Sequence, residues 1–229
     1  MILSLRISLN LLENNFLVRF ITYLYFEHIM IKAIIFDLGG VVFHPDWKSM
    51  NEMMGEEIGI SIFLDKDLRQ IYDYETMVGK TSMEDVFKII IEKNNIDISV
   101  EDAIRIYKKS YEKFSLFDEN IIKLIADLRK KFKIYALSNT NLIHKQVNEE
   151  KGLFENFDDI FMSYDLKMRK PDENIFKEVL KKVELKSEEC VFIDDNPENI
   201  EVARGLGFKG IKFENYEKLI SSLKKTDLN

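Results

Sequence analysis

Short apolar runs alternate with amphipathic helical patterns over most of the chain. Ala33–Phe36 and Val191–Ile193 consist of apolar residues without polar alternation, which is typical of strands buried on both faces of a sheet. Further strands are predicted over residues 133–137, 159–163 and 210–213. Apolar residues three or four positions apart predict helices over residues 119–131, 142–150, 173–183, 197–205 and 216–223. This alternation predicts an α/β fold with a doubly wound parallel sheet.

Residues 46–117 interrupt this alternation. The periodicity there is helical from about Asp67 to Tyr74. Two further helical patterns lie before and after residue 97, and no strand pattern is present. Thr81-Ser82-Met83-Glu84-Asp85 is a helix start with capping-box spacing. Pro45 is expected to block continuation of a strand or helix just before this segment. We therefore expect residues 30–45 and 118–229 to form the core and residues 46–117 to form a small all-helical insertion.

Residues 1–29 form an N-terminal extension of unclear status. They are rich in Leu, Ile, Phe and Tyr, but charged residues interrupt every apolar run before it reaches the roughly 18 residues of a spanning helix. A secretory signal is disfavoured because the segment lacks a basic start and a small-residue cleavage site. Membrane association is not expected, although an interfacial helix stays open. The segment is expected to lie outside the working domain, with Met30 as an alternative native start.

Composition narrows the class of protein. The 229 residues carry 33 basic and 40 acidic side chains, and this net charge of -7 argues against a nucleic acid partner. The 46% hydrophobic and 32% charged residues are typical of a soluble globular protein. Cys190 is the single cysteine, so it has no internal disulfide partner and fits a reducing, cytoplasmic location.

Polar groups follow the predicted strands at their carboxyl ends. Asp37 ends the first strand and precedes two glycines, and Asp194-Asp195 ends another. Ser138 and the turn Arg169-Lys170-Pro171 follow two further strands. Parallel strands point the same way, so these groups are expected to gather along one rim of the sheet, where open α/β sheets bind ligands. Each residue alone also has a structural explanation, since Asp194-Asp195 could cap a helix, Ser138 could sit in a turn and Lys170 could be a solvated charge.

In these motifs the sequence resembles the haloacid dehalogenase superfamily, over about residues 30–213. The matching residues are Asp37-Leu38-Gly39, Ser138, Lys170-Pro171-Asp172 and the stretch from Phe192 to Ala203. The resemblance extends to members with a helical cap of the C1 type between the first two motifs, and among them to glucose-1-phosphate phosphatases. It implies hydrolysis of a small phosphorylated metabolite through an aspartyl-phosphate intermediate.

The resemblance also implies a role for each site residue. Asp37 is the expected nucleophile, and Mg²⁺ is expected to be held by oxygen ligands from Asp37, the backbone carbonyl of Gly39, Asp194 and Asp195. The phosphoryl group is expected to meet Ser138, Asn139 and Lys170. A cation is needed there in any case, because a carboxylate must approach a phosphate dianion.

The first motif departs from the family pattern at Gly39. Phosphatases of the family usually have a second Asp at this position, which protonates the leaving group and later activates water. Without it, esters with an easily expelled oxygen, such as anomeric sugar phosphates, are expected to react best. Asp46 is a candidate substitute acid. The sequence does not reveal the physiological substrate or the oligomeric state.

Two other functions stay open at this point. A metal-independent 2-haloacid dehalogenase also lacks the second Asp, but the pair Asp194-Asp195 is of a metal-binding type that dehalogenases lack. A regulatory protein that binds phosphate or metal without turnover would also be consistent with Gly39. His44 and His144 have no partners at ligand spacing and are interpreted as ordinary loop or helix residues.

Overall fold

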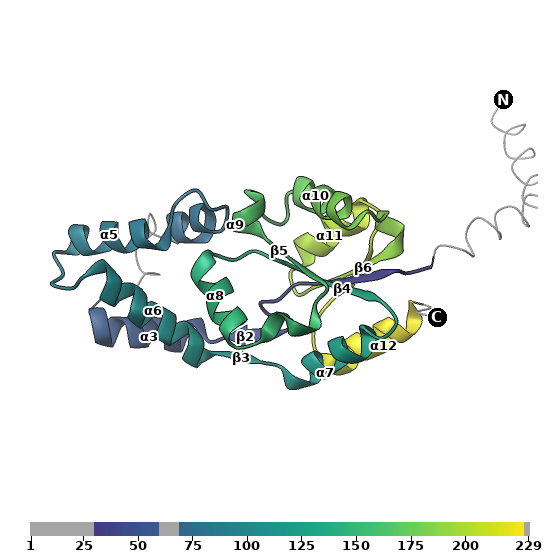
Figure 1. Ribbon diagram of the computed structural model, residues 1–229, viewed down its shortest axis with the longest axis horizontal. Helices are drawn as coiled ribbons and strands as arrows, with labels where there is room; N and C mark the ends of the chain where they lie inside the picture. The colour runs from purple at the N-terminus through teal and green to yellow at the C-terminus, as the bar shows by residue number, and fades with distance from the viewer. Residues whose placement is uncertain (1–29, 60–68, 227–229) are drawn as a thin grey trace, which may run out of the picture.

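A parallel sheet of five strands forms the centre of the molecule in a computed structural model that describes residues 30–59 and 69–226 (Figure 1). The strand order is β5-β4-β1-β6-β7, so β1 lies in the middle. The strands are β1 (Ala33–Phe36), β4 (Lys133–Ser138), β5 (Asp159–Met162), β6 (Cys190–Asp194) and β7 (Lys209–Lys212). The extension expected over residues 1–29 lies outside the described residues.

Helices pack on both faces of this sheet. Because side chains alternate along a strand, Ile34 and Phe36 of β1 face one apolar cluster and Ile35 faces another. The first cluster includes residues of α7 (Glu119–Leu128), α8 (Leu142–Glu150) and α12 (Tyr216–Lys225). The second includes residues of α10 (Glu173–Val183) and α11 (Pro197–Gly205). The predicted doubly wound parallel sheet is therefore confirmed. The core also contains the short helical segments η2 (Leu153–Asn156), α9 (Ser163–Leu166) and η3 (Ser187–Glu189).

The chain between β1 and α7 forms a separate group of helices beyond the carboxyl end of the sheet (Figure 1). We call this group, from Asp46 to Phe114, the helical insertion. Its elements are α3 (Trp47–Ile58), the π-helix η1 (Ile71–Thr76), α5 (Met83–Asn94) and α6 (Val100–Phe114). Ser82 caps α5 with the predicted capping box, in which the Asp85 carboxylate accepts from Ser82 and the Ser82 hydroxyl accepts from the Asp85 N–H.

Two short strands connect the helical insertion to the core. β2 (Phe43–Pro45) and β3 (Ser115–Phe117) pair antiparallel, with Pro45 opposite Ser115. The expectation of helix only over residues 46–117 is wrong at β3. Strand β2 was not predicted, but it ends at Pro45, as expected for a residue that blocks continuation of a strand. A three-residue strand is too short to reveal an alternating pattern, and a two-stranded ribbon tolerates proline because both strands are edges. The π-helix was not foreseen either, since its apolar spacing resembles that of an α-helix.

A buried aromatic and polar network joins the helical insertion to α8. The hydroxyl of Tyr107 lies 2.5 Å from Nε2 of His144 and 2.7 Å from the hydroxyl of Tyr72. The ring of Tyr111 stacks on His144 with 3.8 Å between centroids. His144 is therefore a buried residue of this contact and not the ordinary helix residue expected from sequence. Burial lowers the pKa of His144 to about 3, so it is neutral in the folded protein.

Among the described residues, no helix is both long enough and apolar enough to serve as a membrane span.

The first prediction concerns acid stability. The folded-state pKa of His144 is about 3 and lies below the ordinary 6.5, so the unfolded chain binds a proton first as pH falls. His144 should therefore cost about 1.4 kcal/mol of stability per pH unit below 6.5, down to about pH 3. In H144Q, which does not titrate, this part of the acid dependence should disappear from urea unfolding curves between pH 6.5 and 4.5. An unchanged slope in H144Q would contradict the assignment.

Candidate active site

The predicted polar groups lie at the carboxyl ends of neighbouring strands. Asp37 directly follows β1, Asp194 is the last residue of β6, and Ser138 is the last residue of β4. Phe36 pairs with Ile193, and the Asp37 N–H donates to the Ile193 carbonyl at 2.8 Å, so the two carboxylates start from adjacent backbone positions. Asp194 and Ser138 are fully or almost fully buried. The topology thus brings residues that are far apart in sequence to one rim.

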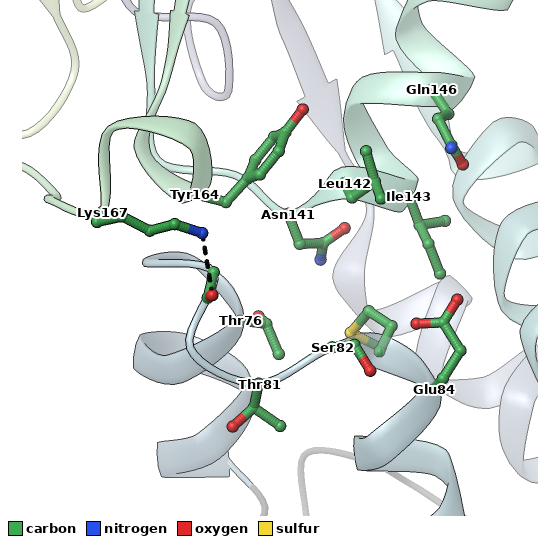
Figure 2. Close-up of a pocket in the computed structure, with 12 residues that line it drawn as sticks. Thr76, Thr81, Ser82, Glu84, Asn141, Leu142, Ile143, Gln146, Tyr164 and Lys167 are labelled. Carbon is green, nitrogen blue, oxygen red and sulfur yellow. Dashed lines mark hydrogen bonds between the residues drawn. The ribbon is translucent and has the colours of Figure 1, made fainter.

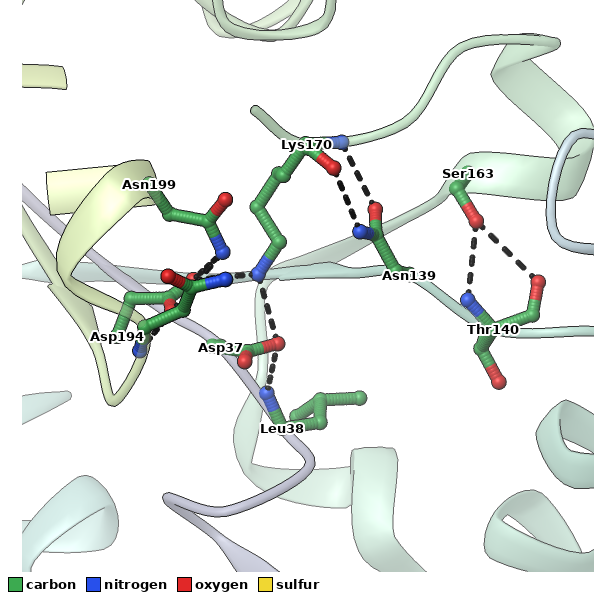
Figure 3. Close-up of polar contacts among 9 residues, drawn as sticks. Asp37, Leu38, Asn139, Thr140, Ser163, Lys170, Asp194 and Asn199 are labelled. Atoms are coloured by element: carbon green, nitrogen blue, oxygen red, sulfur yellow. Dashed lines mark hydrogen bonds and ion pairs between the residues drawn. The ribbon is translucent and has the colours of Figure 1, made fainter. Parts of the chain in front are cut away.

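Lys170 is the cation of this rim. Its Nζ lies 2.8 Å from Oδ1 of Asp37 and 2.6 Å from Oδ2 of Asp194, as Figure 3 shows. Only 1% of the Lys170 side chain is exposed, so this is a buried ion pair network and not a surface contact. The Leu38 N–H also donates to Oδ1 of Asp37 at 2.7 Å. These two donors fix the orientation of the Asp37 carboxylate.

Burial and mutual repulsion shift the pKa values of these groups. Burial raises the pKa of Asp37 to about 7, with Lys170 opposing the rise and Asp194 adding to it. Burial and the adjacent Asp194 raise the pKa of Asp195. Burial alone would lower the pKa of Lys170, but the carboxylates of Asp37 and Asp194 outweigh it and raise that pKa. The carboxylates outnumber the lysine, which leaves a site suited to a further cation.

Asp37, Asp194 and Asp195 form a cluster that suits a divalent metal ion. Each contributes a carboxylate oxygen, and these three oxygens lie within 4.8 Å of one another. Hard oxygen donors with a net negative charge are the ligand set that Mg²⁺ prefers. Gly40 makes the cluster possible because it has φ +83° and a Cβ there would lie 2.3 Å from Oδ2 of Asp195. Gly39 has no such restriction, since a Cβ at that position would meet only the Phe43 ring at 3.9 Å.

Two asparagines support the charged residues. The side chain of Asn139 accepts from the Lys170 N–H and donates to the Lys170 carbonyl, both at 2.9 Å. These bonds position Lys170, and the predicted contact of Asn139 with the phosphoryl group stays a prediction. Asn199, which sequence reasoning missed, donates to both oxygens of Asp194 at 3.0 Å. Asn199 lies in the first turns of the helix that follows Asp194-Asp195, and this position could have indicated that its side chain reaches Asp194.

Asp46 does not have the surroundings of a substitute acid. Its carboxylate accepts from the N–H and the hydroxyl of Ser49, which makes it the N-cap of α3. These bonds lower the pKa of Asp46, so it favours the ionised form and is a poor proton donor. Its proximity in sequence to Asp37 suggested a role that its local hydrogen bonds oppose.

A cavity of about 240 Å³ lies between the helical insertion and the core (Figure 2). One wall comes from the end of η1 and the start of α5, and the other from α8 and the segment around α9. Its polar lining residues include Thr81, Glu84, Asn141, Gln146 and Lys167. The cavity is close to the Ser138 loop through Asn141, but the acidic cluster does not line it.

The molecule is an α/β protein with a parallel sheet whose rim carries three carboxylates and a buried lysine. The chain belongs to the haloacid dehalogenase-like hydrolase family, whose family model matches residues 31–207. The resemblance inferred from the motifs is confirmed by this match.

Known relatives of similar length include phosphatases. The chain is 28% identical over 200 residues to a D-ribitol-5-phosphate phosphatase of Bacteroides thetaiotaomicron, covering 81% of this chain and 93% of the relative. It is also 27% identical over 187 residues to a sesquiterpene phosphatase of Aspergillus oryzae, covering 79% of this chain and 88% of the relative.

The fold also matches solved structures. A haloacid dehalogenase family enzyme of Bacteroides thetaiotaomicron, solved in complex with magnesium and inorganic phosphate, superposes with a TM-score of 0.67 at 25% identity. The match covers 82% of this chain and 98% of that enzyme.

The second prediction tests the role of Gly40. In G40A the new methyl group should displace the Asp195 carboxylate, and a binding site that includes Asp195 should weaken. The increase in melting temperature on adding Mg²⁺ should therefore be smaller in G40A than in the wild type. G39A is the matched control, because its methyl group has room, and it should keep the full increase. Equal increases in both variants would show that Asp195 contributes nothing to binding of the ion.

Proposed function

We propose that this protein is a magnesium-dependent phosphatase that hydrolyses a small phosphate monoester through an aspartyl-phosphate on Asp37. The observation that carries the proposal is the pair of contacts from Lys170 to Asp37 and Asp194, at 2.8 and 2.6 Å, beside a third carboxylate. A phosphatase needs this combination of nucleophile, fixed cation and metal ligands. The phosphatase names of two relatives and the magnesium and phosphate complex of the Bacteroides enzyme support it.

The residues of this chain divide the chemistry between them. Oδ1 of Asp37 is held by the Leu38 N–H and Lys170, so Oδ2 is the oxygen that attacks phosphorus as the bond to the leaving oxygen breaks. Lys170 and the Ser138 hydroxyl stabilise charge on the phosphoryl oxygens. Water then hydrolyses the aspartyl-phosphate and restores Asp37. Bound Mg²⁺, held by Asp37, Asp194, Asp195 and the Gly39 carbonyl, would neutralise negative charge and keep Asp37 ionised.

The domain arrangement fits this chemistry. We propose that residues 30–45 and 118–229 form the catalytic core and that residues 46–117 act as a cap over the rim. We also propose a cytoplasmic location, in keeping with the single thiol of Cys190, which is buried and unpaired. The substrate is a small phosphorylated metabolite that fits between cap and core.

The third prediction tests the reaction. The purified protein should hydrolyse p-nitrophenyl phosphate with Mg²⁺ and stop when a chelator is added. D37N, which removes the nucleophile, should lose at least about a thousandfold in kcat. K177A, which changes an exposed lysine on α10, is the control and should keep full activity.

The same assay separates the alternatives. A 2-haloacid dehalogenase would release halide from a 2-haloacid and would ignore the chelator. The match to the L-2-haloacid dehalogenase of Xanthobacter autotrophicus, at 18% identity and a TM-score of 0.59, concerns the fold alone. A regulatory binding protein would bind Mg²⁺ and phosphate without turnover. Either result would overturn the phosphatase proposal.

The fourth prediction concerns the leaving group. Gly39 offers no general acid, so a sugar phosphate with an easily expelled anomeric oxygen should react fastest. We expect kcat/KM for glucose 1-phosphate to exceed that for glucose 6-phosphate. Ribitol 5-phosphate belongs in the same panel because the Bacteroides relative is named for it. A preference for either of the two esters of primary alcohols would contradict the leaving-group hypothesis while leaving the phosphatase proposal intact.

G39D sharpens this test. A Cβ at this position has room, since the nearest atoms of the described residues are on the Phe43 ring at 3.9 Å, and the backbone is not left-handed. If the missing acid limits the rate, G39D should raise kcat for glucose 6-phosphate by up to about a hundredfold and change kcat for glucose 1-phosphate much less. G39A is the control for the backbone effect of replacing glycine.

A further inference from the structure

The segment from Ser163 to Lys170 is attached to the catalytic rim at both ends. At its start, the Ser163 hydroxyl accepts from the Thr140 N–H at 2.9 Å and donates to the Thr140 carbonyl at 3.2 Å. At its end, the backbone of Lys170 is held by the side chain of Asn139. Figure 3 shows these two attachments on consecutive residues of the loop that follows Ser138. We call residues 163–170 the bridging loop.

Between its two attachments the bridging loop contacts the helical insertion. Lys167 Nζ donates to the Gly79 carbonyl at 3.1 Å, a contact visible at one end of the cavity in Figure 2. Arg169 donates from Nη1 to the Asp73 carbonyl, and its guanidinium lies 5.8 Å from the centre of the Tyr74 ring. Both acceptors are backbone carbonyls in η1 or in the turn after it. Irregular helical turns leave such carbonyls available to outside donors.

Gly79 shows how closely the two parts approach. It has φ +60°, and a Cβ there would lie 2.5 Å from Lys167 Nζ and 2.5 Å from the Tyr164 carbonyl oxygen. The lysine could move aside, but the carbonyl belongs to the backbone of α9 and could not move without shifting the bridging loop. Any side chain at position 79 would therefore push the helical insertion away from the loop.

We propose that Arg169 is a positioning residue that holds the cap closed against the loop carrying Lys170, and that Gly79 is required because Tyr164 and Lys167 of the bridging loop leave no space for a side chain there. The bridging loop then links the cap directly to the catalytic cation, only one residue away from Arg169. Loss of either residue should release η1 from the bridging loop and leave Lys170 and the phosphate site without a fixed cover. The effect on turnover rests on the proposed phosphatase function, whereas the contact itself does not.

The fifth prediction uses R169A and G79A, which disturb two different contacts between the bridging loop and the helical insertion, one from each side. In both variants, hydrogen exchange of the backbone amides over residues 74–81 should be faster than in the wild type, while α7 and α12 keep their protection. With p-nitrophenyl phosphate and Mg²⁺, kcat/KM should fall by about tenfold to a hundredfold, with a change in kcat as well as KM. R169K, which keeps a donor for the Asp73 carbonyl, should fall between R169A and the wild type.

Two controls match these variants. G59A places a methyl group at another left-handed glycine of the helical insertion, with φ +77° and no atom of the described residues within 4 Å, so it carries the backbone strain without the collision at Gly79. R105A removes an exposed arginine that forms an ion pair with Asp102 one turn away on α6. Both should match the wild type in exchange over residues 74–81 and in kcat/KM.

The outcomes separate this inference from the proposed function. Unchanged exchange over residues 74–81 in R169A would overturn the contact, even if G79A fails to fold. Faster exchange with unchanged kcat and KM would overturn the positioning role. If the wild type hydrolyses no phosphate ester, the phosphatase proposal and the role of Arg169 in turnover both fail, and the exchange data then test the contact alone.

Discussion

The buried contact of Lys170 with two carboxylates is the interaction on which this site depends. Asp194 and Lys170 are almost completely shielded from water, and burial of an unpaired charge is costly. Removal of one partner from such a buried network typically costs about 3 to 5 kcal/mol because the other charge is left uncompensated. The lysine therefore allows acidic groups to gather at the rim, yet it does not neutralise all of them. The remaining negative charge makes the site selective for a cation and for a ligand that brings one.

Backbone and asparagine groups around Asp194 and Lys170 hold these charged residues in place. The N–H of Asn196 donates to Asp194 at 2.8 Å, and Asn199 of the helix that follows donates to both carboxylate oxygens. Asn139 fixes the main chain of Lys170 from the neighbouring strand. Asp194 and Lys170 are thus held by groups outside their own side chains, so their positions are set before a substrate arrives.

The family alone does not decide the chemistry. Phosphatases are among the relatives, and a dehalogenase shares the fold at 18% identity. A shared fold does not fix the reaction, so the side chains around Asp37 must decide it. Here the distinguishing feature is Asp195 beside Asp194, because a third carboxylate has no evident use unless a cation is present. Gly39, in contrast, places no acid at the rim two residues after Asp37.

Periodicity, helix caps and strand ends are local features, so the sequence by itself determined the parallel sheet and the positions of Asp37, Ser138, Lys170 and Asp194 at its rim. The helix behind Asp194-Asp195 was equally readable, because Asn196 and Pro197 form its start. Local sequence patterns did not predict elements that are very short or whose apolar spacing matches that of another type of element. The three-residue strand β3 was too short to show alternation, and the π-helix shares its apolar spacing with an ordinary helix.

Only the tertiary structure decided which polar groups meet. Lys170 and Asp194 are 24 residues apart, and Tyr107 and His144 are 37 apart, so no sequence spacing reveals either contact. The side chain of Asn139 bonds to the Lys170 backbone and that of Asp46 to Ser49, and neither pairing is visible in the sequence. The physical reason is that hydrogen-bonding capacity is limited. Which donor takes which acceptor depends on how strands and helices pack in space, and that packing is not encoded in any single stretch of the chain.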